Sequence, residues 1–137
     1  MVHYAKIGGV KYPLSYSLYC AKEISEKYGS VQKAYEILSK SKNDADKFDV
    51  FGNIAESLIK NGCAYCNELG IRYEGAPLDD HGNLIPISAR KILLFASRSE
   101  IEQFVRVMRL VLEDDQKKKV HAVPANNGGK GKKKKKK

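Results

Sequence analysis

The stretch KFDVFGNIAESLI, residues 47–59, has the widest apolar face of the chain. Its large apolar side chains recur every three or four positions, which is the spacing of one side of an α-helix. A face this broad predicts a helix that is buried at the centre of a domain, and we expect it to begin near Ala45 or Asp46. The apolar positions are Phe48, Val50, Phe51, Ile54, Ala55, Leu58 and Ile59.

This central helix has two candidate ends, at Gly62 or, beyond the run CAYCNE at residues 63–68, at Gly70. Continuation to Gly70 keeps Leu58 and Leu69 on one side of the helix. A single glycine inside a helix costs only about 1 kcal/mol relative to alanine. We therefore predict that the helix continues to Gly70.

Two shorter helices are predicted before the central one, because periodic apolar residues follow serines that can act as N-caps. The first begins at Ser15 or Ser17 and stops at Gly29. The second begins at Ser30 and includes Leu38. A polar run at residues 39–44 then predicts a surface loop.

Two more helices are predicted near the carboxyl end. Ser88 caps a short one, and Ser99 with Glu102 fits the capping box of a longer one. We expect the longer helix to end at residues 113–115, since acidic residues oppose the dipole at a helix C-terminus. The apolar positions of these two helices are Ile92, Leu93 and Phe95, then Ile101, Phe104, Val105, Met108, Val111 and Leu112.

A β-hairpin is predicted at the amino end, where Gly8-Gly9 supplies the positive φ values of a type I′ turn. Pro13 is expected to end the strand pairing, because proline offers no N–H to a ladder. Residues 70–87 are rich in turn formers, and only Ile71–Tyr73 is a candidate for a brief strand. The predicted fold class is mainly α, with about five helices behind an N-terminal hairpin in one small domain.

The charge of the chain is divided unevenly between its two parts. The 137 residues have a net charge of +9, but residues 1–115 hold 15 Lys and Arg against all 16 acidic residues. Residues 116–137 hold 10 Lys and no acid. The predicted division is thus a domain at 1–115 and a disordered basic tail at 116–137. A folded basic nucleic-acid groove is disfavoured.

No run of 18 apolar residues and no signal-peptide core occurs, and three cysteines fit a reducing cytoplasm better than a disulfide framework. Cys63 and Cys66 form a C-x-x-C, for which buried core thiols are favoured over a zinc or redox site. The loop at residues 79–83 has metal-capable side chains, for which a polar turn is favoured. No phosphate loop or serine-hydrolase motif occurs, so we expect neither an enzyme nor a cofactor.

The run at residues 132–137 allows three interpretations. It can bind nucleic acid non-specifically, it can be a solvated tail without a partner, or it can reflect its messenger RNA. Lysine codons are AAA and AAG, so six consecutive lysines require an A-rich tract on which a ribosome can slip.

Three short segments resemble the tail assembly chaperones of long-tailed bacteriophages. Residues 6–14, KIGGVKYPL, are similar to that family's opening pattern I-x-G-x-x-Y-x-L. Residues 23–29 are similar to its E-x-x-x-x-Y-G ending of a helix. The central apolar helix followed by Gly62-Cys63-Ala64-Tyr65 matches its G-x-x-Y. The resemblance covers most of residues 6–115, but the chain departs from many members in its CAYC pair and its long lysine tail, and the resemblance explains neither.

The resemblance implies a protein that coats the tape measure protein, keeps it soluble and helps recruit tail tube subunits. It implies a short product whose longer form arises by −1 ribosomal frameshifting at the A-rich tract. It places the protein in the host cell cytoplasm and not in the finished virion. It carries no catalytic residue, and self-association is consistent with a coating role.

We expect the apolar stripe of the last helix to contribute to tape measure binding, the alternative being that its side chains are ordinary core. The residues concerned are Phe104, Met108, Val111 and Leu112. The rival hypothesis is a small nucleic-acid-binding accessory protein that uses its basic tail. The tail residues concerned are Lys130, Lys132, Lys133, Lys134, Lys135, Lys136 and Lys137.

Overall fold

The computed structural model describes residues 2–122 of the chain and the side chains of residues 2–114. Within this part of the chain, five helices follow a two-stranded antiparallel hairpin, which confirms the predicted mainly α class. The elements are β1 (His3–Ile7), β2 (Val10–Leu14), α1 (Leu18–Tyr28), α2 (Val31–Lys40), α3 (Asp44–Leu69), α4 (Ala89–Phe95) and α5 (Arg98–Ala122). Residues 123–137, with the lysine run, lie outside the described residues.

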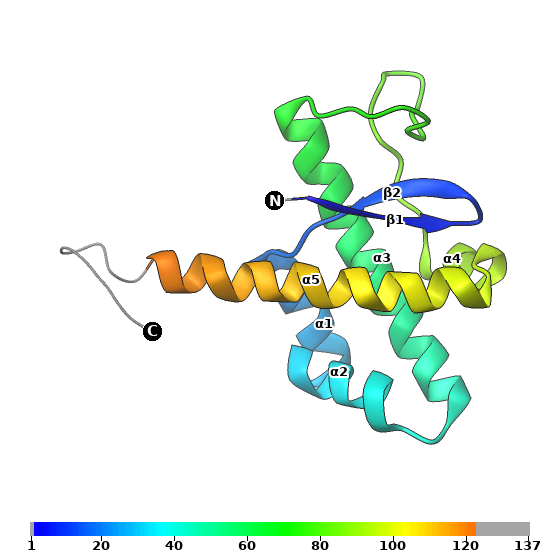
Figure 1. The fold of residues 1–137 in the computed structure, drawn as a ribbon, viewed down its shortest axis with the longest axis vertical. Coiled ribbons are helices and arrows are strands. Elements are labelled where there is room, and N and C mark those ends of the chain that lie inside the picture. Colours follow the sequence, from blue (N-terminus) through cyan, green and yellow to red (C-terminus); the bar gives the residue numbers. More distant parts are fainter. Residues whose placement is uncertain (1, 123–137) are drawn as a thin grey trace.

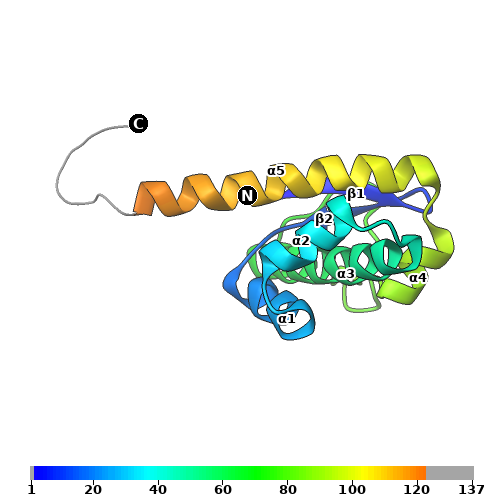
Figure 2. The ribbon, with the colours of Figure 1, turned by 90° about the horizontal axis from the view of Figure 1, so that it is seen from below.

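The elements form two layers, and α3 is the central helix of one of them. The hairpin and α5 lie side by side in one layer, with β1 along α5 and β2 against α3 (Figures 1 and 2). The other layer holds α3 with α1, α2 and α4 packed around it (Figure 2). The core lies between these layers. There the rings of Phe51 and Phe104 pack edge to face, with their centroids 5.4 Å apart.

The predicted central helix is confirmed as α3, which passes through Gly62 and ends at the left-handed Gly70. Gly62 is buried under β2, and a Cβ atom there would lie 2.2 Å from the carbonyl oxygen of Pro13. The backbone N–H of Ser15 donates to the carbonyl oxygen of Leu58 on the same helix, at 3.2 Å. The glycine therefore allows the hairpin to lie directly on the backbone of α3.

The hairpin turns at Gly8-Gly9 with φ values of 60° and 80°, as predicted for a type I′ turn. The prediction that Pro13 ends the pairing is wrong, because Pro13 pairs with Tyr4 and β2 continues to Leu14. In an antiparallel pair, alternate residues turn their N–H away from the partner strand. Counted from the Gly8-Gly9 turn, position 13 is one whose backbone nitrogen faces away from β1. A proline there removes no hydrogen bond between the strands.

Two predictions for α5 are corrected. Its capping box is Ser97 with Glu100, because Ser97 Oγ accepts from the N–H of Glu100 at 3.1 Å and the Glu100 carboxylate accepts from the N–H of Ser97 at 3.0 Å. Ser99 with Glu102 is therefore not the box. The helix also continues past residue 115 to Ala122.

Ser17, Ser30 and Ser88 cap α1, α2 and α4, as predicted. The predicted loop at residues 39–44 is shorter, because α2 continues to Lys40 and α3 begins at Asp44. Residues 70–87 are irregular apart from an isolated bridge between Leu78 and Leu84. The candidate strand at residues 71–73 is not formed. Tyr73 instead contacts the hairpin through its side chain, since its hydroxyl donates to the carbonyl oxygen of Lys11 at 2.6 Å.

Candidate functional site

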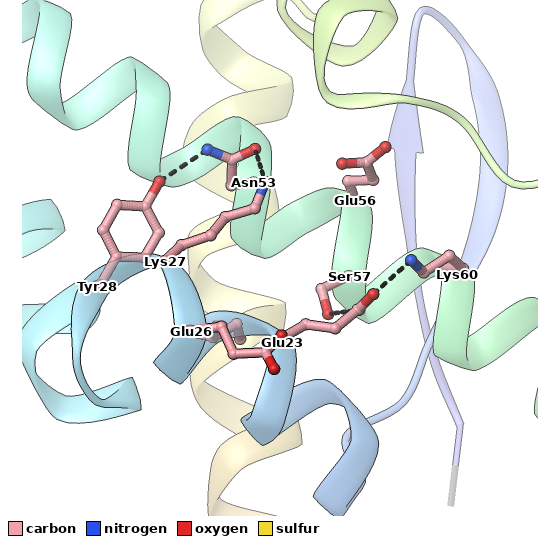
Figure 3. Close-up of a pocket in the computed structure, with 9 residues that line it drawn as sticks. Glu23, Glu26, Lys27, Tyr28, Asn53, Glu56, Ser57 and Lys60 are labelled. Atoms are coloured by element: carbon pink, nitrogen blue, oxygen red, sulfur yellow. Dashed lines mark hydrogen bonds and ion pairs between the residues drawn. The ribbon is translucent and has the colours of Figure 1, made fainter.

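A polar pocket of about 220 Å³ lies between α1 and α3 (Figure 3). At its centre the carboxylate of Glu23 accepts hydrogen bonds from Ser57 Oγ at 2.8 Å and from Lys60 Nζ at 2.6 Å. Burial raises the pKa of Glu23, but these two hydrogen bonds outweigh that effect and lower its pKa overall. Glu23 is therefore a charged, paired carboxylate at neutral pH.

In the other half of the pocket, the polar side chains also form hydrogen bonds with one another. Asn53 Nδ2 donates to the hydroxyl of Tyr28 at 2.7 Å, and Lys27 Nζ donates to Asn53 Oδ1 at 3.1 Å. Figure 3 shows these contacts linking α1 to α3. A carboxylate with a lowered pKa is a weak base, so Glu23 is poorly suited to activate the Ser57 hydroxyl. The chemistry of the pocket is that of a polar connection between two helices.

The cysteines of the C-x-x-C lie on the buried side of α3. Burial raises the pKa of Cys63 to about 12, with the neighbouring Cys66 adding to the shift. Burial also raises the pKa of Cys66, although Arg72 opposes this. Both groups are therefore protonated at neutral pH, and a protonated thiol is a poor nucleophile and metal ligand. Among residues 2–122, no group of three His, Cys, Asp or Glu side chains is placed to hold a metal ion.

The loop at residues 79–83 forms a polar turn in which the Asp79 carboxylate is already occupied. Its Oδ1 accepts the backbone N–H groups of His81 at 2.8 Å and Asn83 at 3.0 Å. These two bonds lower the pKa of Asp79 and close the turn. The carboxylate therefore serves the backbone of its own loop.

The residues predicted to bind a partner lie mostly in the core. Phe104 and Met108 are fully buried, Val111 is buried, and Leu112 is half-buried. The first three contribute to the same hydrophobic cluster as Phe51 on α3. A docking surface must therefore be sought among other side chains. The tail lysines Lys130 and Lys132–Lys137 lie outside the described residues.

Exposed apolar side chains gather instead at the end of α4. Leu93, Leu94 and Phe95 are consecutive and are 41 %, 64 % and 57 % exposed. Phe95 packs against Gly8 in the hairpin turn. We call Leu93, Leu94 and Phe95 the α4 patch.

Cations flank the α4 patch, since Arg90, Lys91 and Arg98 are exposed on and just after α4. The sequence contained a signal for this surface that helical periodicity alone missed. Four consecutive large apolar residues, ILLF at 92–95, cannot all turn inward on a single short helix. Only Ile92 of these four is buried.

No family model, curated protein or solved structure matches this chain. Among the described residues, no helix is both long and apolar enough to cross a membrane.

Proposed function

We propose that this chain is a tail assembly chaperone of a long-tailed phage, in its short form. It acts in the host cell cytoplasm, binds the tape measure protein and keeps it soluble, and helps to recruit tail tube subunits. The observation that carries the proposal is the α4 patch, where three consecutive large apolar residues are exposed on a folded domain.

The physical argument rests on what such a patch can do. Covering one large apolar side chain stabilises a contact by roughly 1.5–3 kcal/mol. Tape measure proteins are long and largely helical, with apolar stripes that need cover before a tail tube encloses them. A small domain that offers apolar side chains on a stable core can supply this cover and release it later.

The positions of the resembling segments support the proposal. Gly8-Gly9 of the first segment forms the hairpin turn against which Phe95 packs. Tyr28-Gly29 of the second segment ends α1, and Gly62 of the third is the point at which the hairpin contacts α3. Each segment thus has a structural role at a junction of the fold.

Co-expression tests the proposal. The tape measure protein of the same phage is expressed alone, with this chain, or with the double variant Leu94→Ser/Phe95→Ser. We expect the wild-type chain to raise the soluble fraction of tape measure protein several-fold, and the double variant to lose most of that effect. Leu110→Ser is the matched control, because Leu110 is 48 % exposed on α5. Tape measure protein that stays insoluble beside the wild-type chain would contradict the proposal.

The longer form has a separate test in the nucleotide sequence under residues 130–137. We expect a slippery A-rich heptamer with an open −1 reading frame beyond it. Mixed lysine codons that break the A-run, with no open frame downstream, would remove the frameshifting part of the proposal.

The second candidate is non-specific nucleic-acid binding, which the lysine run at residues 132–137 favours. It differs from the chaperone proposal in the part of the chain that it requires. Deleting residues 123–137 should strongly reduce DNA binding under this candidate and leave tape measure binding largely intact under the chaperone proposal.

A further inference from the structure

An apolar hollow of about 310 Å³ lies where α2, α3 and α5 meet. Figure 2 shows α2 and α3 in the layer beneath α5. It is lined by Tyr35, Leu38, Ser39, Lys47, Phe48, Phe51, Ile101, Val105 and Arg109. We call it the α2–α5 groove, and it shares no residue with the α4 patch.

The floor of the α2–α5 groove is an extension of the core. Phe51 at its base is 1 % exposed, while Phe48, one helical turn earlier on α3, is 42 % exposed. Ile101 and Val105 of α5 are half-buried on the other side. The apolar face of α3 is thus wider than the cover that α5 and α2 provide.

The polar members of the lining are strongly one-sided in charge. The lining holds two cations, Lys47 and Arg109, and no carboxylate, although Glu113, outside the lining, acts electrostatically on Arg109. A side-chain hydrogen bond with Tyr35 raises the pKa of Arg109 further, so this group stays charged. Cations at the edge of a low-dielectric hollow attract a ligand that carries negative charge beside an apolar group.

We propose that the α2–α5 groove binds a helical segment of a partner protein, which inserts a bulky apolar side chain over Phe48 and presents Asp or Glu residues to Lys47 and Arg109. The volume is at the lower limit of small-molecule pockets, which span about 300–1,000 Å³, and it suits one or two inserted side chains. Apolar anchors with a charged rim are the usual form of helix-in-groove recognition. Identifying the partner helix with the tape measure protein rests on the proposed function.

The direct test measures binding of labelled model helices to the full chain by fluorescence anisotropy. One peptide has leucines along one face with glutamates beside them, and its matched peptide has lysines in place of the glutamates. We expect the glutamate peptide to bind at least about tenfold more tightly, a difference of about 1.4 kcal/mol.

Two groove variants and one control variant locate that binding. Phe48→Ser removes the exposed apolar floor, and Lys47→Ser/Arg109→Gln removes both cations. Each variant should bind the glutamate peptide at least about tenfold more weakly than the wild type does. The control Lys40→Ser/Arg106→Gln removes the same charge from exposed positions of α2 and α5 outside the groove, and should change binding less than about twofold. Circular dichroism checks that each variant is folded.

Three outcomes would overturn the inference. Equal weakening by the control pair would indicate general charge attraction, including that of the lysine tail. Full competition by decanoate, with direct binding of decanoate to the groove, would assign the groove to a small amphiphilic carboxylate. A concentration-dependent dimer that Phe48→Ser abolishes would assign it to a second copy of this chain.

The inference and the proposed function fail in distinguishable ways. If the wild-type chain solubilises the tape measure protein and the two groove variants do so equally well, the groove is not the tape measure site while the chaperone function stands. If the wild-type chain fails to solubilise it, the function fails, and the peptide measurements still decide whether the groove binds an acidic helix.

Discussion

At the scale of single residues, Glu100 joins two parts of the chain that are far apart in sequence. Its carboxylate accepts the N–H of Ser97 in the capping box and those of Gly8 and Gly9 in the hairpin turn, at 2.8 and 2.9 Å. Burial raises its pKa, but these backbone hydrogen bonds outweigh it and lower the pKa overall. One side chain therefore caps α5 and holds the hairpin to it.

Replacing this carboxylate should weaken the fold in a pH-dependent way. Glu100→Gln should lower the free energy of unfolding by about 1–2 kcal/mol at pH 7, since charged acceptors bind backbone donors more strongly than amides do. A lowered pKa means that this stabilisation is present above about pH 4.3 and is lost as the pH falls through the folded-state pKa. Urea unfolding at pH 7 and pH 3.5 measures both effects.

The variant should accordingly lose less stability than the wild type between those two pH values. Glu102→Gln is the control, because Glu102 is exposed on the same helix. Identical pH profiles for the wild type and Glu100→Gln would show that the carboxylate contributes nothing to stability.

The sequence predicted the capping box at Ser99 with Glu102, whereas the structure forms it at Ser97 with Glu100. The two pairs have the same spacing and begin two residues apart. The choice depends on the hairpin turn, which provides Glu100 with two more donors. Local pattern therefore predicted the kind of cap, while a contact across 92 positions determined which residues form it.

Gly62 gives a second prediction at this scale. Glycine to alanine inside a helix normally stabilises by about 1 kcal/mol. Gly62→Ala should instead destabilise by at least about 2 kcal/mol, because the new methyl group would meet the Pro13 carbonyl oxygen at 2.2 Å. Urea denaturation measures the difference.

Gly52→Ala on the same helix is the matched control. An added Cβ there meets the side chains of Leu93 at 3.3 Å and Ala89 at 3.5 Å and no backbone atom of another element within 3 Å, so the change should stay within about 1 kcal/mol. Equal effects of the two substitutions would contradict the close approach of β2 to α3.

At the scale of elements, α5 has an inner face and an outer face along residues 104–111. Met108 is fully buried, and Leu110, two residues later, is 48 % exposed. Met108→Glu should lower the stability by at least about 3 kcal/mol, because it places an unpaired charge in the core. Leu110→Glu should change it by less than about 1 kcal/mol.

Thermal unfolding followed by circular dichroism compares the two variants. A folded Met108→Glu protein with the wild-type midpoint would place that side chain outside the core. If Met108→Glu is destabilised as expected, loss of partner binding by that variant reflects unfolding, so binding experiments should use substitutions on the exposed faces.

Helical periodicity predicted the apolar stripe of α5 but not what covers it. Phe104 and Met108 are covered by this chain itself, and the same spacing would have suited a partner surface equally well. The exposed surface arises on α4, where too many consecutive apolar residues occupy one short helix. The α2–α5 groove had no sequence signal, because its residues come from three separate helices.

At the scale of the whole molecule, most of the net positive charge lies outside the described fold. Residues 123–137 carry seven of the 25 Lys and Arg residues, and the described fold ends at residue 122. Deleting residues 123–137 should therefore leave the thermal midpoint within about 1 °C, because no described element is removed.

The same deletion should reduce binding to double-stranded DNA and make the remaining binding less dependent on salt, since fewer counterions are released. Electrophoretic mobility shifts at two salt concentrations measure this. A deletion variant with unchanged DNA affinity would assign the binding to the folded domain.

The packing of the hairpin against α5 also sets an order of events during synthesis. Residues 3–14 leave the ribosome well before residues 98–114, yet His3 Nε2 lies 2.5 Å from Asp114 Oδ2 and the hairpin turn is held by Glu100. The packing of β1 is therefore incomplete until the last helix has been made. A nascent chain stalled before α5 would expose the apolar residues of β1 to chaperones and proteases, and release of α5 would close the domain in a single late step.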